Sequence, residues 1–468
     1  MQSLSSAFAV LVPPARFLLI SLLVAVACVG LARPVLAQDA ALRAAAESGD
    51  AQAQLELGLA FLNATGAGRD PRLAAMWFDR AARQGNAEAM NQLGYLYSMG
   101  EGVSRDDTRA AALFEQAAQL KLARAQYNIG TAYAVGRGVP QDDKRAAYWY
   151  GEAIKSNDPL AAYALGRLYD TGRLGPPNPT EAARLYKLSA DQNNMLGQYR
   201  FALALANGRG VAPDAKQAVE LMTRAAQAGL DEAQLALGDM LVGGIAGQPD
   251  LGQAVKWYGM AAQQGMAMAQ LKYGNAYFTG AGVERNLPVA YSWLHRAALQ
   301  GQTDAMYLIG VFLAGGVGVE RDPVEAYKWM LLAERNRFVR AASVRAAMSK
   351  QLTPAQIAKA EAAANEFRPR FERANDVPLT SPSAATRPQQ LPATPATGTP
   401  PPGPAVSPLG PAALPPLAGP SPAPAPPRPQ PYVNGIDNTP NLTTPNGANG
   451  SQPAAPADGG PVPLYKSR

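Results

Sequence analysis

The chain has 468 residues, a net charge of +6 at pH 7 and 41 prolines, most of which follow Asn375, so the folded part is shorter than the chain. This modest charge is too small to indicate a nucleic-acid-binding protein. Because Cys28 is the only cysteine and His295 the only histidine, a single chain cannot supply a histidine-based catalytic triad or a multi-histidine metal site.

Residues 1–37 are predicted to be a signal peptide. A basic residue precedes an apolar run over residues 17–31, and small residues follow it, so cleavage is expected between Ala37 and Gln38. The apolar run is shorter than the ~20 residues that span a bilayer, but it could stay uncleaved as an anchor. Alternatively, Cys28 could be lipidated, which would make the protein an outer-membrane lipoprotein.

A capping helix is expected over residues 38–49, followed by eight repeats over residues 50–337. The repeats are marked by an alanine that recurs every 36 residues without an insertion, and each of the five tryptophans lies three residues after one of these alanines. Such a fixed period is typical of a solenoid in which each repeat is one helical hairpin. The eight alanines are Ala74, Ala110, Ala146, Ala182, Ala218, Ala254, Ala290 and Ala326.

Each repeat is predicted to contain two amphipathic helices, because apolar residues recur three and four positions apart in both halves. In the first repeat Asp70 stands where the second helix should be capped, and Pro71 follows it at the first helical position. Gly58 lies in the middle of the first helix, where glycine costs up to ~1 kcal/mol, and therefore indicates a close approach of the two helices. The cap position holds Asp70, Asp106, Asp142, Asn178, Asp214, Asp250, Asn286 and Asp322.

Two further helices are expected within a C-terminal capping segment, residues 338–371. Thr353 and Gln356 form a predicted capping box with proline at the first helical position. Residues 372–468 are rich in proline and alanine and cannot bury enough surface to offset chain entropy, so they are predicted to be a disordered tail. The predicted fold is all-α: a right-handed α-solenoid of eight 36-residue hairpins with helical caps.

The repeat pattern resembles the Sel1-like repeat family, a branch of the tetratricopeptide-like solenoids. The 36-residue period and a G-x-G-V loop favour this family over the ordinary tetratricopeptide repeat of 34 residues. The third repeat shows the resemblance best, through Ala125, Gly130, Tyr133, the loop 136–139, Asp142, Ala146, Trp149, Tyr150 and Ala153.

The resemblance implies a non-catalytic scaffold or adaptor that binds a protein or peptide partner. Bacterial members with export signals often serve in the cell envelope, so the periplasm is the expected location. Neither a cofactor nor a metal is expected, nor a nucleic acid, and membrane contact is expected only if the leader is retained or Cys28 is lipidated. His295 shares its repeat position with Asp79 and Lys187, which is typical of a solvent-facing site without a function.

The alternative is an envelope enzyme that acts on peptidoglycan or β-lactams, since some cysteine-rich relatives are associated with β-lactams. This chain lacks the paired cysteines of those relatives and the S-x-x-K and K-T-G motifs of serine β-lactamases. The resemblance therefore does not support that activity here.

The binding site is expected on the concave face, which the first helix of each repeat lines in related solenoids. One position in these helices holds tyrosine in three successive repeats, with further tyrosine and arginine residues three positions before and four positions after it. Tyrosine and arginine are frequent at binding hot spots, although leucine in the same position of other repeats is consistent with half-buried core. The candidate residues are Tyr95, Arg124, Tyr127, Tyr163, Arg167 and Tyr199.

Overall fold

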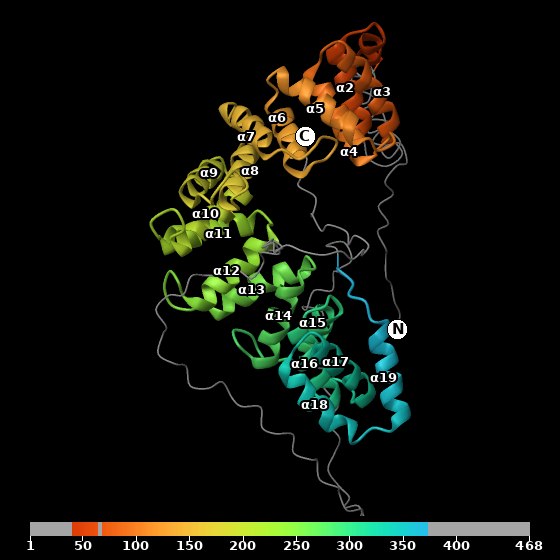
Figure 1. The fold of residues 1–468 in the computed structure, drawn as a ribbon, viewed down its shortest axis with the longest axis vertical. Coiled ribbons are helices and arrows are strands. Elements are labelled where there is room, and N and C mark those ends of the chain that lie inside the picture. Colours follow the sequence, from red (N-terminus) through yellow and green to blue (C-terminus); the bar gives the residue numbers. More distant parts are fainter. Residues whose placement is uncertain (1–39, 64–67, 373–468) are drawn as a thin grey trace, which may run out of the picture. The chain divides into compact units, whose positions relative to one another are not determined.

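The computed structural model describes residues 40–63 and 68–372. The predicted signal peptide, its cleavage site and the tail beyond residue 372 lie outside the described residues. The chain forms successive helical hairpins with no strand in the described ranges (Figure 1). The all-α hairpin stack expected from the sequence is thus confirmed, and residues 40–47, within the expected N-terminal cap, are helical.

The eight hairpins each consist of a first and a second helix. The first helices are α2 (Ala51–Asn63), α4 (Ala87–Met99), α6 (Ala123–Val135), α8 (Pro159–Asp170), α10 (Met195–Asn207), α12 (Asp231–Gly243), α14 (Ala267–Thr279) and α16 (Thr303–Gly315). The second helices are α3 (Pro71–Arg83), α5 (Asp107–Gln119), α7 (Asp143–Lys155), α9 (Pro179–Asp191), α11 (Ala215–Gln227), α13 (Leu251–Gln263), α15 (Leu287–Leu299) and α17 (Pro323–Arg335). Two more helices follow, α18 (Val339–Ser349) and α19 (Pro354–Glu366).

The described residues divide into two compact units. The N-terminal unit contains residues 40–204 and 208–212, and the C-terminal unit contains residues 205–207 and 213–372. In the C-terminal unit both α18 and α19 pack against α17. Thr353 and Gln356 form the capping box that the sequence predicts.

Every second helix begins at the predicted cap. The Asp70 side chain accepts hydrogen bonds from two backbone N–H groups of the first turn of α3, and each of the seven equivalent residues accepts from one or two such groups of its own helix. A side-chain cap of this kind stabilises a helix by about 0.5–2 kcal/mol. The caps therefore start each second helix at the same point of every repeat.

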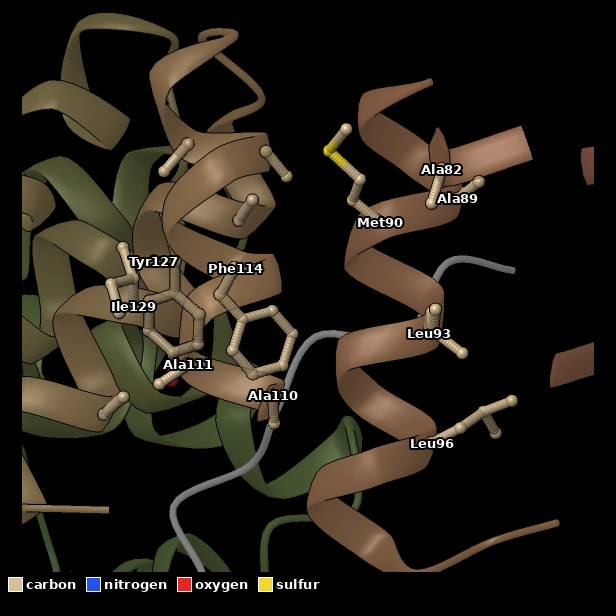
Figure 2. Packing of buried hydrophobic residues seen from close by; sticks show 14 of the residues in the cluster. Ala82, Ala89, Met90, Leu93, Leu96, Ala110, Ala111, Phe114, Tyr127 and Ile129 are labelled. Carbon is tan, nitrogen blue, oxygen red and sulfur yellow. The ribbon is translucent and has the colours of Figure 1, made fainter. Parts of the chain in front are cut away.

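The two helices of a hairpin approach closely at the predicted glycine. A methyl group on Gly130 of α6 would lie 2.8 Å from ring atoms of Tyr150 of α7 and 3.3 Å from the carbonyl oxygen of Ala146. Gly94 of α4 lies against Phe114 of α5 in the same way, and Figure 2 shows this ring beside the neighbouring core residues. The glycine thus makes room for a ring from the second helix.

The glycine-rich loops connect the two helices of a hairpin and also contact the preceding hairpin. Gly138, in the loop between α6 and α7, has a φ of 73° and lies against the backbone of Asp107 at the start of α5, where a Cβ atom would overlap the carbonyl group. The loop glycines Gly102, Gly210, Gly282 and Gly318 contact the start of the preceding second helix in the same way. These loops therefore form contacts between hairpins.

Candidate partner-binding face

The six candidate residues lie on the first helices of the N-terminal unit, but their exposure differs. Tyr127 of α6 is 1% exposed and Tyr199 of α10 is 8% exposed, so both belong to the core. Tyr95 and Tyr163 are half-buried, and Arg167 of α8 is exposed. The structure therefore brings only part of the predicted set to a surface.

Tyr127 packs inside its hairpin. Its ring centroid lies 5.8 Å from that of Tyr150, and burial raises the pKa of its hydroxyl well above the ordinary value. A ring in this position stabilises the stack instead of offering contact area to a partner. The reason is that α6 packs against its own second helix, α7, and against the second helix of the preceding hairpin, α5.

Arg124 is held by a charge in the preceding repeat. Its Nη1 lies 3.2 Å from Oε1 of Glu88 on α4, and both side chains are partly exposed. These two residues occupy the same position in successive repeats. Comparing that position from one repeat to the next would therefore have predicted the ion pair from the sequence. Arg124 therefore forms a cross-repeat ion pair on this face.

Exposed Arg167 and half-buried Tyr163 and Arg200 form the Tyr163 cluster. The guanidinium of Arg167 lies 5.9 Å from the centroid of the Tyr163 ring, at cation–π distance. Arg200 of α10 lies close to Tyr163, with its guanidinium 5.5 Å from the centroid of the Tyr199 ring, and its Nε is buried without a hydrogen-bond partner. Within the described residues neither arginine takes part in an ion pair. Sequence reasoning missed Arg200.

The histidine is less exposed than the sequence indicates. His295 is half-buried, because its ring stacks on Tyr291 at 5.6 Å and meets the edge of Trp329 at 5.7 Å. Burial lowers the pKa of His295 below its ordinary value. The expectation of a solvent-facing position is therefore wrong, and the ring serves as an aromatic packing element.

The described residues offer no cluster for metal chemistry and no span for a membrane. No three His, Cys, Asp or Glu residues among them are placed to hold a metal ion. None of the described helices is long and apolar enough to cross a bilayer.

Asp158 is a buried carboxylate with a structural role. Burial raises its pKa, and it caps α8 by accepting a hydrogen bond from the N–H of Ala161 at 2.8 Å.

A stack of capped helical hairpins with polar and aromatic side chains on its surface defines an α-solenoid of the interaction-scaffold class. The chain belongs to the Sel1 repeat family. The Sel1 repeat model matches eight times, at residues 51–86, 87–122, 123–158, 159–194, 196–230, 231–266, 267–302 and 303–336. Members of this family are generally non-catalytic scaffolds that bind proteins.

Two solved structures show the same fold. One is c5321, a protective antigen of uropathogenic Escherichia coli with an SLR fold, which is 33% identical with a TM-score of 0.60 over 70% of each chain. The other is a Sel1 repeat protein from Oxalobacter formigenes, which is 30% identical with a TM-score of 0.52 over 68% of this chain and 91% of that chain. Among curated proteins, no significant match was found.

Proposed function

We propose that this protein is a non-catalytic scaffold of the bacterial cell envelope that binds a protein or peptide through the face lined by its first helices. The family supports the general role, and the apolar run and cleavage pattern of residues 1–37 support export to the periplasm. The Tyr163 cluster supports the position of the site.

The observation that carries the proposal is the exposed guanidinium of Arg167, which lies 5.9 Å from the centroid of the half-buried Tyr163 ring. Half-buried Arg200 adds a second guanidinium to the cluster. An exposed arginine over a tyrosine ring suits the carboxylate and carbonyl oxygens of a partner segment, because guanidinium groups bind such oxygens bidentately.

The test is partner capture from envelope extracts followed by affinity measurement. We expect Tyr163→Ala combined with Arg167→Ala to weaken binding of the captured partner at least tenfold, equivalent to ~1.4 kcal/mol. The matched control combines Tyr148→Ala with Arg184→Ala, which removes the same side-chain types from exposed positions on α7 and α9. Circular dichroism establishes that both double variants remain folded.

Unaltered affinity in the folded Tyr163/Arg167 variant would move the site away from the first-helix face. Turnover of a muropeptide or a β-lactam by purified protein that captures no partner would replace the scaffold with the envelope enzyme. Recovery of the protein in the cytoplasmic fraction of a bacterial host would contradict the envelope location.

A further inference from the structure

The chain returns along the C-terminal unit after α19. Residues 367–372, the C-terminal strap, lie across the ends of successive hairpins. The Phe367 ring meets that of Trp329 in the eighth hairpin at 5.4 Å. The N–H of Arg370 then donates to the carbonyl oxygen of Leu299 in the seventh hairpin at 3.0 Å. The strap therefore shows how this solenoid holds an extended peptide.

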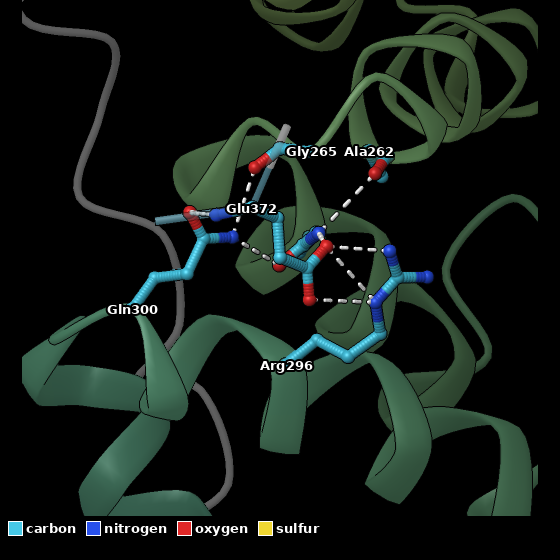
Figure 3. Close-up of polar contacts among 6 residues, drawn as sticks. Ala262, Gly265, Arg296, Gln300 and Glu372 are labelled. Atoms are coloured by element: carbon cyan, nitrogen blue, oxygen red, sulfur yellow. Dashed lines mark hydrogen bonds and ion pairs between the residues drawn. The ribbon is translucent and has the colours of Figure 1, made fainter. Parts of the chain in front are cut away.

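The strap ends in a clamp around the carboxylate of Glu372 (Figure 3). Arg296 of α15 donates to both carboxylate oxygens, at 3.0 Å from Nε and 2.5 Å from Nη2. Gln270 of α14 donates to the same group at 2.7 Å. Gln300 accepts from the N–H of Glu372 at 3.2 Å and donates to Gln270 at 2.9 Å. The guanidinium of Arg296 also lies over the Trp293 ring, 4.5 Å from its centroid.

The first hairpin contains the same four residues six repeats earlier. Gln54 of α2 corresponds to Gln270, and Trp77, Arg80 and Gln84 of the α3 segment correspond to the tryptophan, arginine and glutamine of the clamp. Gln84 donates to Gln54 at 2.8 Å, and the Arg80 guanidinium lies 4.6 Å from the Trp77 ring. The side-chain arrangement is thus the same in both hairpins.

The surroundings of the two clamps differ. In the seventh hairpin a Cβ atom on Gly265 would meet Glu372 at 3.0 Å, and one on Gly301 would meet Pro369 at 3.4 Å. At the corresponding glycines of the first hairpin, Gly49 and Gly85, nothing described lies within 4 Å. Arg80 is exposed, and in the described part of the chain it has no ion-pair partner.

We propose that the first hairpin binds a glutamate side chain in an extended segment of a protein partner, with Arg80 and Gln54 on the carboxylate and Gln84 on the backbone. No other hairpin has all four residues, since the sixth has Met260 in place of the arginine and the fifth has Ala228 in place of the second glutamine. The strap of a second copy is the less suitable occupant, because each strap already pairs within its own chain, where both Arg296 and Glu372 are about four-fifths covered.

This site lies apart from the Tyr163 cluster, so each proposal can fail without the other. The test uses the full chain and a dye-labelled peptide with the sequence of residues 366–374, whose binding is followed by fluorescence anisotropy. We expect Arg80→Gln to weaken peptide binding at least tenfold. Arg224→Gln, in the same position of the fifth hairpin, should leave binding unchanged, as should the Tyr163→Ala and Arg167→Ala pair.

A peptide with glutamine in place of the residue corresponding to Glu372 should bind at least tenfold more weakly. The proposal is overturned if the peptide does not bind, or if it binds equally well to Arg80→Gln. It is also overturned if Arg296→Gln rather than Arg80→Gln removes binding, because the peptide would then be exchanging with the strap. The full chain could also self-associate. If both Arg80→Gln and Glu372→Gln abolish that self-association, the site binds a second copy of the chain, and the proposal of a different protein partner is overturned.

Discussion

The close contact between Gly130 and Tyr150 predicts opposite effects for one substitution at two helical glycines. Gly130→Ala places a methyl group 2.8 Å from the Tyr150 ring, and the ring is 2% exposed and hydrogen-bonded to Thr131 at 3.1 Å, so it cannot move away. Overpacking of this kind costs about 1–3 kcal/mol. Gly151, in the interior of α7, has nothing within 4 Å of an added Cβ atom.

Both substitutions gain the same helix propensity, about 0.5–1 kcal/mol, so the difference between them isolates the steric contact. We expect Gly151→Ala to raise the free energy of unfolding by about that amount. Gly130→Ala should lower it by up to about 2 kcal/mol, the overpacking cost less the propensity gain. Thermal and urea unfolding followed by circular dichroism measure both effects against the parent chain.

A third variant tests the cause. In a Tyr150→Ala background the ring is gone, so Gly130→Ala should become stabilising, and the two substitutions should be strongly non-additive. The reasoning is refuted if Gly130→Ala stabilises the parent chain as much as Gly151→Ala does, or if Tyr150→Ala leaves its effect unchanged.

Three other stability measurements test the packing. Glu372→Gln should lower the unfolding free energy of the C-terminal unit by about 1–3 kcal/mol because it removes the charge partner of Arg296, whereas exposed Glu366→Gln should have little effect in the same thermal melt. Ala146→Leu, at a position with 0% exposure, should cost about 1–3 kcal/mol in urea unfolding. Burial raises the pKa of Tyr150 from 10.0 to about 12, so between these values the folded state keeps a proton that the unfolded chain loses. The free energy of unfolding should therefore fall between pH 10 and 12. Phenolate absorbance should show this ring ionising only as the chain unfolds.

The hairpins could be predicted from the sequence because their signals are local. An aspartate or asparagine that caps a helix acts within its own first turn, and Gly58 faces Phe78 only 20 positions later, within the same hairpin. The 36-residue period repeats these local signals eight times, so the helix positions inferred from one repeat can be checked against the other seven.

The surface of the binding face could be predicted only in part. Helix periodicity shows which residues share a side of a helix, but Tyr127 and Tyr163 share a repeat position and differ in exposure. That difference depends on neighbouring repeats, which periodicity within one helix does not describe. The Glu88–Arg124 pair is likewise a contact between repeats.

The strap could not be predicted because its contacts span long distances in the chain. The sequence places the boundary of the tail after residue 371, where proline-rich composition begins. Yet Glu372 pairs with Arg296, 76 residues earlier. In the sequence Glu372 lies between Arg370 and Arg373, and nothing there indicates that its partner is instead Arg296, which the structure shows directly.

The loop glycines have a consequence for chain length. Gly138 reaches the backbone of Asp107 only if the loop brings it to the same place against the preceding hairpin. One inserted residue would put a side chain with a Cβ atom into a joint that has no room for one, and would push adjacent hairpins apart. The contacts between each loop glycine and the preceding hairpin therefore keep the repeat length at 36 residues. Exposed positions within each hairpin can change their chemistry without altering the spacing of the stack.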